Sequence, residues 1–160
     1  MAKRRGVEAA VIRSATTADL DKVLALADRL RVGVAPWREE AAVTTAVRGW
    51  VRAPLATVAE PGHAVLVAEL DDVVVGFVTL SPGAHWAGDP DASIGELVVS
   101  AEAEGRGVGR ALVEAALERA RDNGCTRVSV STGAANEQAR SLYRRLGFED
   151  EDVTLSRALR

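Results

Sequence analysis

The sequence lacks the features that would place it in several common protein classes. It has a single cysteine, so it forms no internal disulfide, which fits a cytoplasmic protein. That cysteine and the two histidines lie far apart in the chain, so we expect no metal site. No apolar run approaches the length of a membrane span. The first residues lack the apolar core and the cleavage site of a secretory signal.

The charge balance also excludes one class of partner. Lys and Arg number 20 and Asp and Glu 23, so the formal net charge is -3, and we expect no basic face for nucleic acid. The apolar content of 48% and charged content of 27% are ordinary for a soluble globular protein. We therefore expect one domain over residues 9–160, preceded by a flexible segment at residues 1–8.

Hydrophobic periodicity predicts an alternation of strands and helices. The predicted strands cover residues 11–13, 64–70, 73–80, 93–100, 127–130 and 153–159, and the residues between 81 and 91 read as a loop. The predicted helices cover residues 17–31, 36–52 and 108–122, with a last helix whose apolar face holds Ala139, Leu142, Tyr143 and Leu146. This order predicts an α/β (α+β) fold, with a mixed sheet and helices on its faces.

The most informative segment is Glu-Gly-Arg-Gly-Val-Gly-Arg at residues 104–110. Its glycines free the backbone to bring amide groups close to a bound group. The helix that follows has no Ser, Thr, Asp or Asn in the capping position, so its first amides need another acceptor. An anion at the helix N-terminus would supply it, which predicts a phosphate cradle.

Spacing excludes two common versions of such a cradle. A P-loop needs Lys followed by Ser or Thr after its last glycine, whereas Arg110 and Ala111 follow Gly109 here. The dinucleotide fingerprint G-x-G-x-x-G fails from either Gly105 or Gly107. Taken alone, the loop is equally well explained as a tight turn between a strand and a helix.

Four segments taken together indicate which kind of phosphate site the glycine loop belongs to. They are Gly-Glu-Leu-Val-Val-Ser at 95–100, Gly-Arg-Gly-Val-Gly-Arg-Ala-Leu at 105–112, Asn-Glu-Gln-Ala-Arg-Ser-Leu-Tyr at 136–143 and Leu-Gly-Phe at 146–148. The combination closely resembles the GNAT superfamily of acetyl-CoA-dependent N-acetyltransferases, over about residues 93–150. The resemblance implies a mixed, mostly antiparallel central sheet with helices on both faces. It also implies a bulged fourth strand that splays from the fifth.

The resemblance further implies acetyl-CoA as co-substrate, without a metal. Pantetheine would bind backbone groups near Leu97, Val98 and Val99, and Asn136 would be a weaker contact besides capping the last helix. The pyrophosphate would bind the amides of Glu104, Gly105, Arg106, Gly107, Val108, Gly109 and Arg110. The family usually has Gln or Arg where this chain has Glu104. A carboxylate there repels the pyrophosphate unless it points to solvent, and Arg106 and Arg110 are candidates to offset its charge.

Two side chains are candidates for proton transfer. Tyr143, the single tyrosine, would donate to the departing thiolate by resemblance, although its place on an apolar helix face also fits a core aromatic. Glu96 is an acid within an apolar strand, and burial would raise its pKa toward that of a general base. The alternative for Glu96 is a polar residue on an open strand face.

The implied reaction is the transfer of acetyl to a primary amine by direct attack in a ternary complex. By resemblance, the regions of Trp37, Trp50, His85 and Trp86 wall the acceptor site, although buried core anchors explain Trp37 and Trp50 as well. One alternative function is a non-catalytic acyl-CoA-binding regulatory module, and another is a structural domain without a ligand. An edge strand near the C-terminus is a candidate for pairing in a homodimer.

Overall fold

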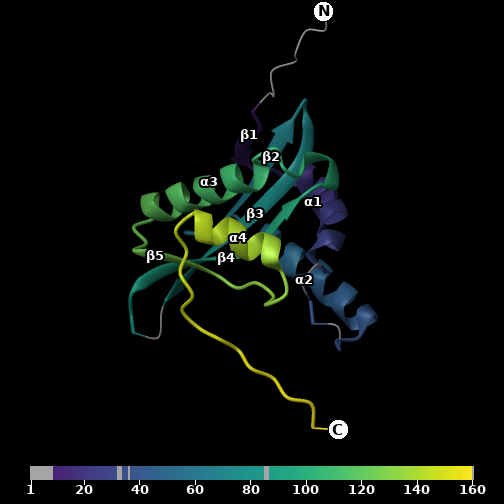
Figure 1. Cartoon of the computed structure of the whole chain (residues 1–160). Coiled ribbons are helices and arrows are strands. Elements are labelled where there is room, and N and C mark those ends of the chain that lie inside the picture. The colour runs from purple at the N-terminus through teal and green to yellow at the C-terminus, as the bar shows by residue number, and fades with distance from the viewer. Residues whose placement is uncertain (1–8, 32–33, 36, 85–86, 160) are drawn as a thin grey trace, which may run out of the picture.

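The computed structural model describes residues 9–31, 34–35, 37–84 and 87–159. Its centre is a five-stranded sheet in the order β1-β2-β3-β4-β5 (Figure 1). The strands are β1 (Val11–Ser14), β2 (Ala64–Leu70), β3 (Val73–Ala84), β4 (Pro90–Val99) and β5 (Arg127–Val130). Neighbours from β1 to β4 are antiparallel, and β5 runs parallel to β4, which confirms the expected sheet.

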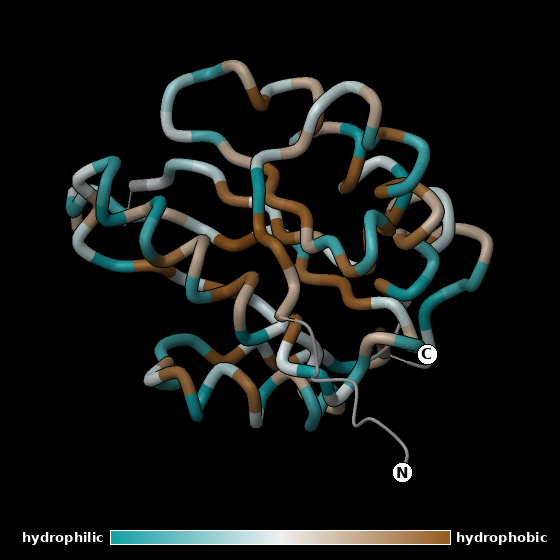
Figure 2. Tube along the Cα trace, turned by 90° about the horizontal axis from the view of Figure 1, so that it is seen from above, coloured by the Kyte–Doolittle hydropathy of each residue, from teal (hydrophilic) through white to brown (hydrophobic). Residues whose placement is uncertain are grey.

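Helices cover both faces of this sheet. They are α1 (Leu20–Leu26), α2 (Glu40–Thr57), α3 (Val108–Asp122) and α4 (Glu137–Arg145), with short 3-10 helices η1 (Thr17–Asp19), η2 (Ala27–Arg31) and η3 (Ala101–Ala103). Successive residues of β2 point to opposite faces. Leu66 belongs to the core under α3 and α4, and Val67 to the core under α1 and α2. Figure 2 shows these apolar stretches running through the centre of the molecule.

A two-residue turn joins β2 to β3, as predicted. Asp71 and Asp72 have φ values of 50° and 63°, in the left-handed region. Two consecutive residues in that region are typical of the turn whose twist matches paired antiparallel strands. Asp is among the residues that adopt it at low cost.

β4 carries the expected β-bulge. Gly95 and Glu96 together lie opposite the single residue Thr79 of β3. The Glu96 amide donates to the Thr79 hydroxyl at 2.9 Å. A Cβ on Gly95 would lie 2.8 Å from the same oxygen, so only glycine fits there without a shift. The bulge redirects β4 just before the strand parts from β5.

The two strands part where expected. β5 pairs with β4 over four residues only, from Asp91 to Ile94. The continuation of β4 from Leu97 to Val99 keeps β3 as its partner on the other side. One edge of this continuation is therefore not covered by β5, and the candidate site lies along it.

The second helix differs from its predicted bounds. It begins at Glu40 rather than residue 36 and ends at Thr57 rather than residue 52. Pro54 lies inside it, although proline removes one backbone hydrogen bond. Val47 and Val51 are buried against the sheet, and this packing keeps the helix continuous past the proline. Pro36 itself lies outside the described residues.

The predicted loop at residues 81–91 is shorter than expected. β3 continues to Ala84 and β4 begins at Pro90, so cross-strand pairing overrides the turn residues Pro82 and Gly83. The strand predicted at residues 153–159 is wrong, because residues 148–159 form neither helix nor strand. Val153, Leu155 and Leu159 are 80%, 90% and 95% exposed. An alternating pattern forms a strand only where another strand supplies backbone partners.

Candidate functional site

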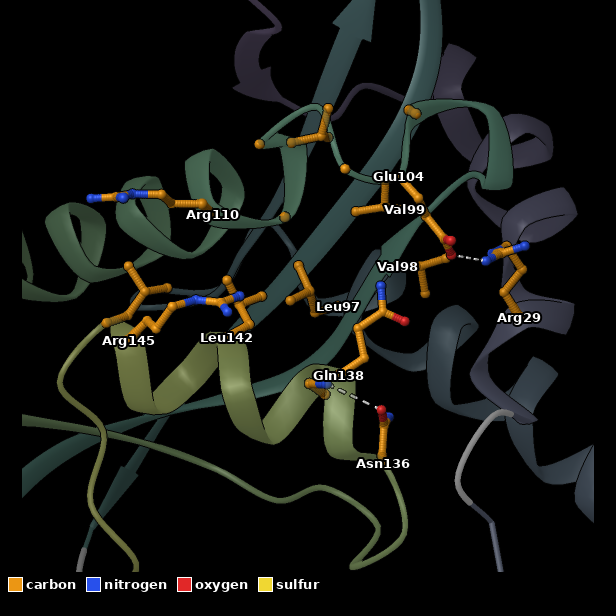
Figure 3. Close-up of a pocket in the computed structure, with 17 residues that line it drawn as sticks. Arg29, Leu97, Val98, Val99, Glu104, Arg110, Asn136, Gln138, Leu142 and Arg145 are labelled. Carbon is orange, nitrogen blue, oxygen red and sulfur yellow. Dashed lines mark hydrogen bonds and ion pairs between the residues drawn. The ribbon is translucent and has the colours of Figure 1, made fainter.

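A cleft of about 440 Å³ lies between β4, the glycine loop and the two helices α3 and α4 (Figure 3). Every residue predicted to bind the cofactor lines this cleft except Arg106. They are Leu97, Val98, Val99, Glu104, Gly105, Gly107, Val108, Gly109, Arg110 and Asn136. The structure therefore gathers at one cleft a set of residues that the sequence places in three separate segments.

The glycine loop delivers an uncapped helix end to the cleft. Gly107 is the N-cap of α3 with a φ of 80°, and no side chain accepts a hydrogen bond there. The first amides of a helix have no intrahelical acceptor. A Cβ placed on Gly107 would meet nothing within 4 Å, so the loop backbone borders open space. This end of α3 can accept an anion.

The backbone of β4 also presents polar groups to the cleft. The Ser100 amide donates to the Val75 carbonyl of β3 at 2.7 Å. Amide direction alternates along a strand, so the Val98 amide also faces β3, while those of Leu97 and Val99 face the uncovered edge. Of the three residues near which pantetheine is expected to bind, Leu97 and Val99 therefore direct their amides toward the cleft and Val98 does not.

The carboxylate of Glu104 has a partner that the sequence did not suggest. Arg29 of η2 forms an ion pair with it across the end of the cleft (Figure 3). Arg110 instead pairs with Glu114, one turn along α3, at 2.8 Å. Arg29 is 75 residues from Glu104, so no local pattern could connect them.

Helix α4 forms the opposite wall. Asn136 caps it, because its Oδ1 accepts from the Ala139 amide at 3.2 Å. Gln138, Leu142 and Arg145 also line the cleft. Sequence reasoning missed these three, although their spacing of i, i+4 and i+7 places them on one face of a helix.

Neither of the two candidate proton-transfer residues is among the residues that line the cleft. Tyr143 is 7% exposed, and its ring meets that of Phe148 edge-on at 5.4 Å between centroids. Burial raises the pKa of Tyr143 to about 12, and the charge of Glu96 adds to this rise. Burial raises the pKa of Glu96 to about 7. The structure thus brings these two residues into one electrostatic environment.

Two of the aromatic residues expected near the acceptor, Trp37 and Trp50, are not buried. Trp37 is 70% exposed and Trp50 of α2 is 47% exposed, so their interpretation as core anchors is wrong. His85 and Trp86 lie outside the described residues.

Within the described ranges, no group of three or more His, Cys, Asp or Glu side chains is arranged to hold a metal ion. No helix described in the structure combines the length and apolar character that crossing a membrane requires.

Comparisons with known proteins agree with this geometry. An N-acetyltransferase of Methanocaldococcus jannaschii is 35% identical over 91 residues, which cover 54% of this chain and 39% of that protein. The chain thus matches about two fifths of that relative's length.

Solved structures share the whole fold. A transcriptional regulator from Bacillus halodurans has a TM-score of 0.70 at 26% identity, over 94% of this chain and 99% of its own. AAC(6′)-Iy in complex with a CoA-containing bisubstrate analogue has a TM-score of 0.67 at 21% identity, over 94% of this chain and 99% of its own. The family model described as acetyltransferase (GNAT) matches residues 24–148. The chain therefore belongs to the acetyltransferase (GNAT) family.

Proposed function

We propose that this chain transfers an acetyl group from acetyl-CoA to a primary amine by direct attack within a ternary complex. The observation that carries the proposal is the cleft itself, where the uncovered edge of β4 meets the uncapped N-terminus of α3. The cleft thus combines a strand edge able to bind an amide-bearing arm with a helix end able to bind phosphate.

Acetyl-CoA has the chemistry to occupy both parts. Its pyrophosphate is suited to the amides of the glycine loop, and its pantetheine amides to the backbone of Leu97 and Val99. The solved relative with a CoA-containing analogue shows that this fold accommodates such a ligand in that protein. Membership of the family supports the same co-substrate here.

The chemistry then requires two proton movements. The neutral amine nitrogen attacks the thioester carbonyl, forming a C–N bond, and the C–S bond breaks as the thiolate leaves. In this proposal Glu96 accepts the proton lost by the amine, directly or through water, and Tyr143 donates one to the thiolate. The same proposal assigns polarisation of the carbonyl oxygen to the Val99 amide.

An assay with acetyl-CoA and a panel of amines, following release of free thiol, tests this proposal. We expect release with at least one primary amine. Cofactor binding with no turnover across the panel would favour a regulatory acyl-CoA module. Acetyl-CoA at about one hundred times its Kd should add roughly 2.7 kcal/mol of stability, so no thermal shift at millimolar acetyl-CoA would favour a ligand-free domain.

We propose that the chain acts in the cytoplasm, because its single cysteine fits a reducing compartment.

We also propose that residues 153–159 pair with the outer edge of β5 in a second copy of the chain. Among the described strands β5 has β4 as its one neighbour. Val153, Leu155 and Leu159 are highly exposed, and an edge strand offers backbone groups with which another chain can pair. Light scattering after size exclusion should show a dimer that Leu155→Asp converts to a monomer. A monomeric parent protein would contradict the proposal.

A further inference from the structure

The ion pair between Arg29 and Glu104 joins two layers of the molecule at the end of the cleft (Figure 3). Glu104 follows η3 and begins the glycine loop, whereas Arg29 belongs to η2, between α1 and α2. Both side chains line the cleft and both are partly exposed. The pair therefore sits where an incoming ligand would meet it.

The ion pair holds the one negative side chain among the described residues of the cleft. Among the described residues that line the cleft, Glu104 is the sole acid. Arg110 is engaged with Glu114 at 2.8 Å, and Arg145 donates to Ser141 at 3.0 Å. Among the described arginines that line the cleft, Arg29 is the one that pairs with the Glu104 carboxylate, so Arg29 carries its neutralisation.

A free carboxylate in this position would oppose the proposed ligand. The backbone of Glu104 belongs to the loop that is suited to phosphate, so its side chain cannot be far from a bound pyrophosphate. The negative charges of a carboxylate and a nearby pyrophosphate repel each other, because water at a protein surface screens them only partly. Pairing with a guanidinium both cancels the charge and fixes the direction of the carboxylate.

We infer that Arg29 is a positioning residue for acetyl-CoA, which acts by holding the Glu104 carboxylate neutralised and directed away from the phosphate site. The inference rests on the proposed function. It also makes cofactor affinity depend on the placement of η2, since this helix brings Arg29 to the loop. The acceptor-side layer of α1 and α2 thereby contributes to a site built mainly from β4, α3 and α4.

A double-mutant cycle on CoA affinity, measured by isothermal titration calorimetry, tests this inference. We expect Arg29→Ala to raise the Kd for CoA about tenfold, because it leaves the carboxylate unpaired. Glu104→Gln should bind CoA at least as tightly as the parent protein. In the double variant, loss of Arg29 should change the Kd by less than about threefold relative to Glu104→Gln alone. This rescue distinguishes neutralisation from a merely structural role.

Asp150→Asn is the matched control. Like Glu104→Gln, it removes one negative charge, in this case from a carboxylate that pairs with Arg144 at 3.0 Å and belongs to a residue that does not line the cleft. The control should leave the Kd unchanged, and all variants should unfold within a few degrees of the parent protein.

Two results would overturn the inference while leaving the proposed function intact. One is a parent protein that binds CoA and an Arg29→Ala variant that binds equally well. The other is an equal loss from Arg29→Ala in both backgrounds, which would make Arg29 a direct phosphate ligand. A parent protein that does not bind CoA would instead remove the proposed function together with the inference.

Discussion

Burial and, after it, the charge of Glu96 raise the pKa of the Tyr143 phenol to about 12. Burial alone raises the pKa of Glu96 to about 7. Above pH 7 the carboxyl group is thus mainly ionised while the phenol keeps its proton. The two environments separate the pKa values of a candidate base and a candidate acid, an arrangement found in acid–base active sites.

Replacing Tyr143 by Phe should lower turnover at least tenfold while CoA affinity stays close to that of the parent protein. The substitution removes the hydroxyl proton but keeps the ring that packs on Phe148. Steady-state kinetics with calorimetric CoA binding measures both effects. Unchanged turnover would remove Tyr143 from the mechanism.

The activity should depend on pH through Glu96. Below its pKa of about 7 the carboxyl is protonated and cannot accept a proton, so kcat/KM should fall as the pH drops below 7. Glu96→Gln should lower kcat/KM and abolish this acidic limb. An identical pH profile in parent and variant would assign the limb to another group, such as the amine substrate.

The stability of the fold should depend on the ion pair between Arg13 of β1 and Asp19 of η1. Arg13 donates to both carboxylate oxygens of Asp19, at 2.7 and 3.0 Å, and Asp19 is fully buried. Asp19→Asn should cost about 2–3 kcal/mol in urea unfolding at pH 7. This loss is smaller than the ~3–5 kcal/mol that removing one partner of a fully buried pair costs, because the Arg13 side chain is 33% exposed.

The pH dependence of this contribution has a definite sign. The hydrogen bonds from Arg13 hold the pKa of Asp19 well below its ordinary value. The stabilisation is therefore complete above the unfolded-state pKa near 4 and is lost as the pH falls below it. The gap between parent and Asp19→Asn should narrow in acid. The exposed neighbour Asp21, changed to Asn, should shift stability by less than about 0.5 kcal/mol, and an equal loss there would contradict the assignment.

Gly107→Val should weaken CoA binding more than it weakens folding. The φ of 80° costs an L-residue about 1–2 kcal/mol, and a β-branched side chain more. Gly107→Asn separates the two effects, because Asn tolerates this conformation yet still adds a side chain beside the loop. We expect near-parental unfolding and weakened CoA binding for Asn, measured by thermal shift and calorimetry. Normal binding by both variants would mean that the loop does not hold the phosphates.

Much of the fold follows from local patterns. The β-rich apolar runs of β2 and β3, the two-residue Asp71–Asp72 turn between them and the 3.6-residue period of α3 all predict the observed elements. The failures occur where distant contacts decide. Packing of Val51 carries α2 past Pro54, and pairing with β4 extends β3 through Pro82. The alternation at residues 153–159 is real, but none of the strands that the structure describes pairs with it.

The cleft shows the same division. The glycine loop and the β4 segment could be predicted, because their backbone roles depend on glycine positions and strand alternation. Helical spacing does predict that Gln138 and Arg145 share one face of α4, but nothing in that spacing indicates that this face lines a cleft. The pairing of Arg29 with Glu104 could not be predicted from the sequence, since it depends on how η2 packs beside β4.

The most direct test of the whole account is a crystal structure of this chain grown with acetyl-CoA. The account predicts the pyrophosphate against the amides of residues 104–110 and the thiol arm along Leu97 and Val99, between β4 and α4. A cleft that stays closed to the ligand, or acetyl-CoA bound on another face, would contradict it.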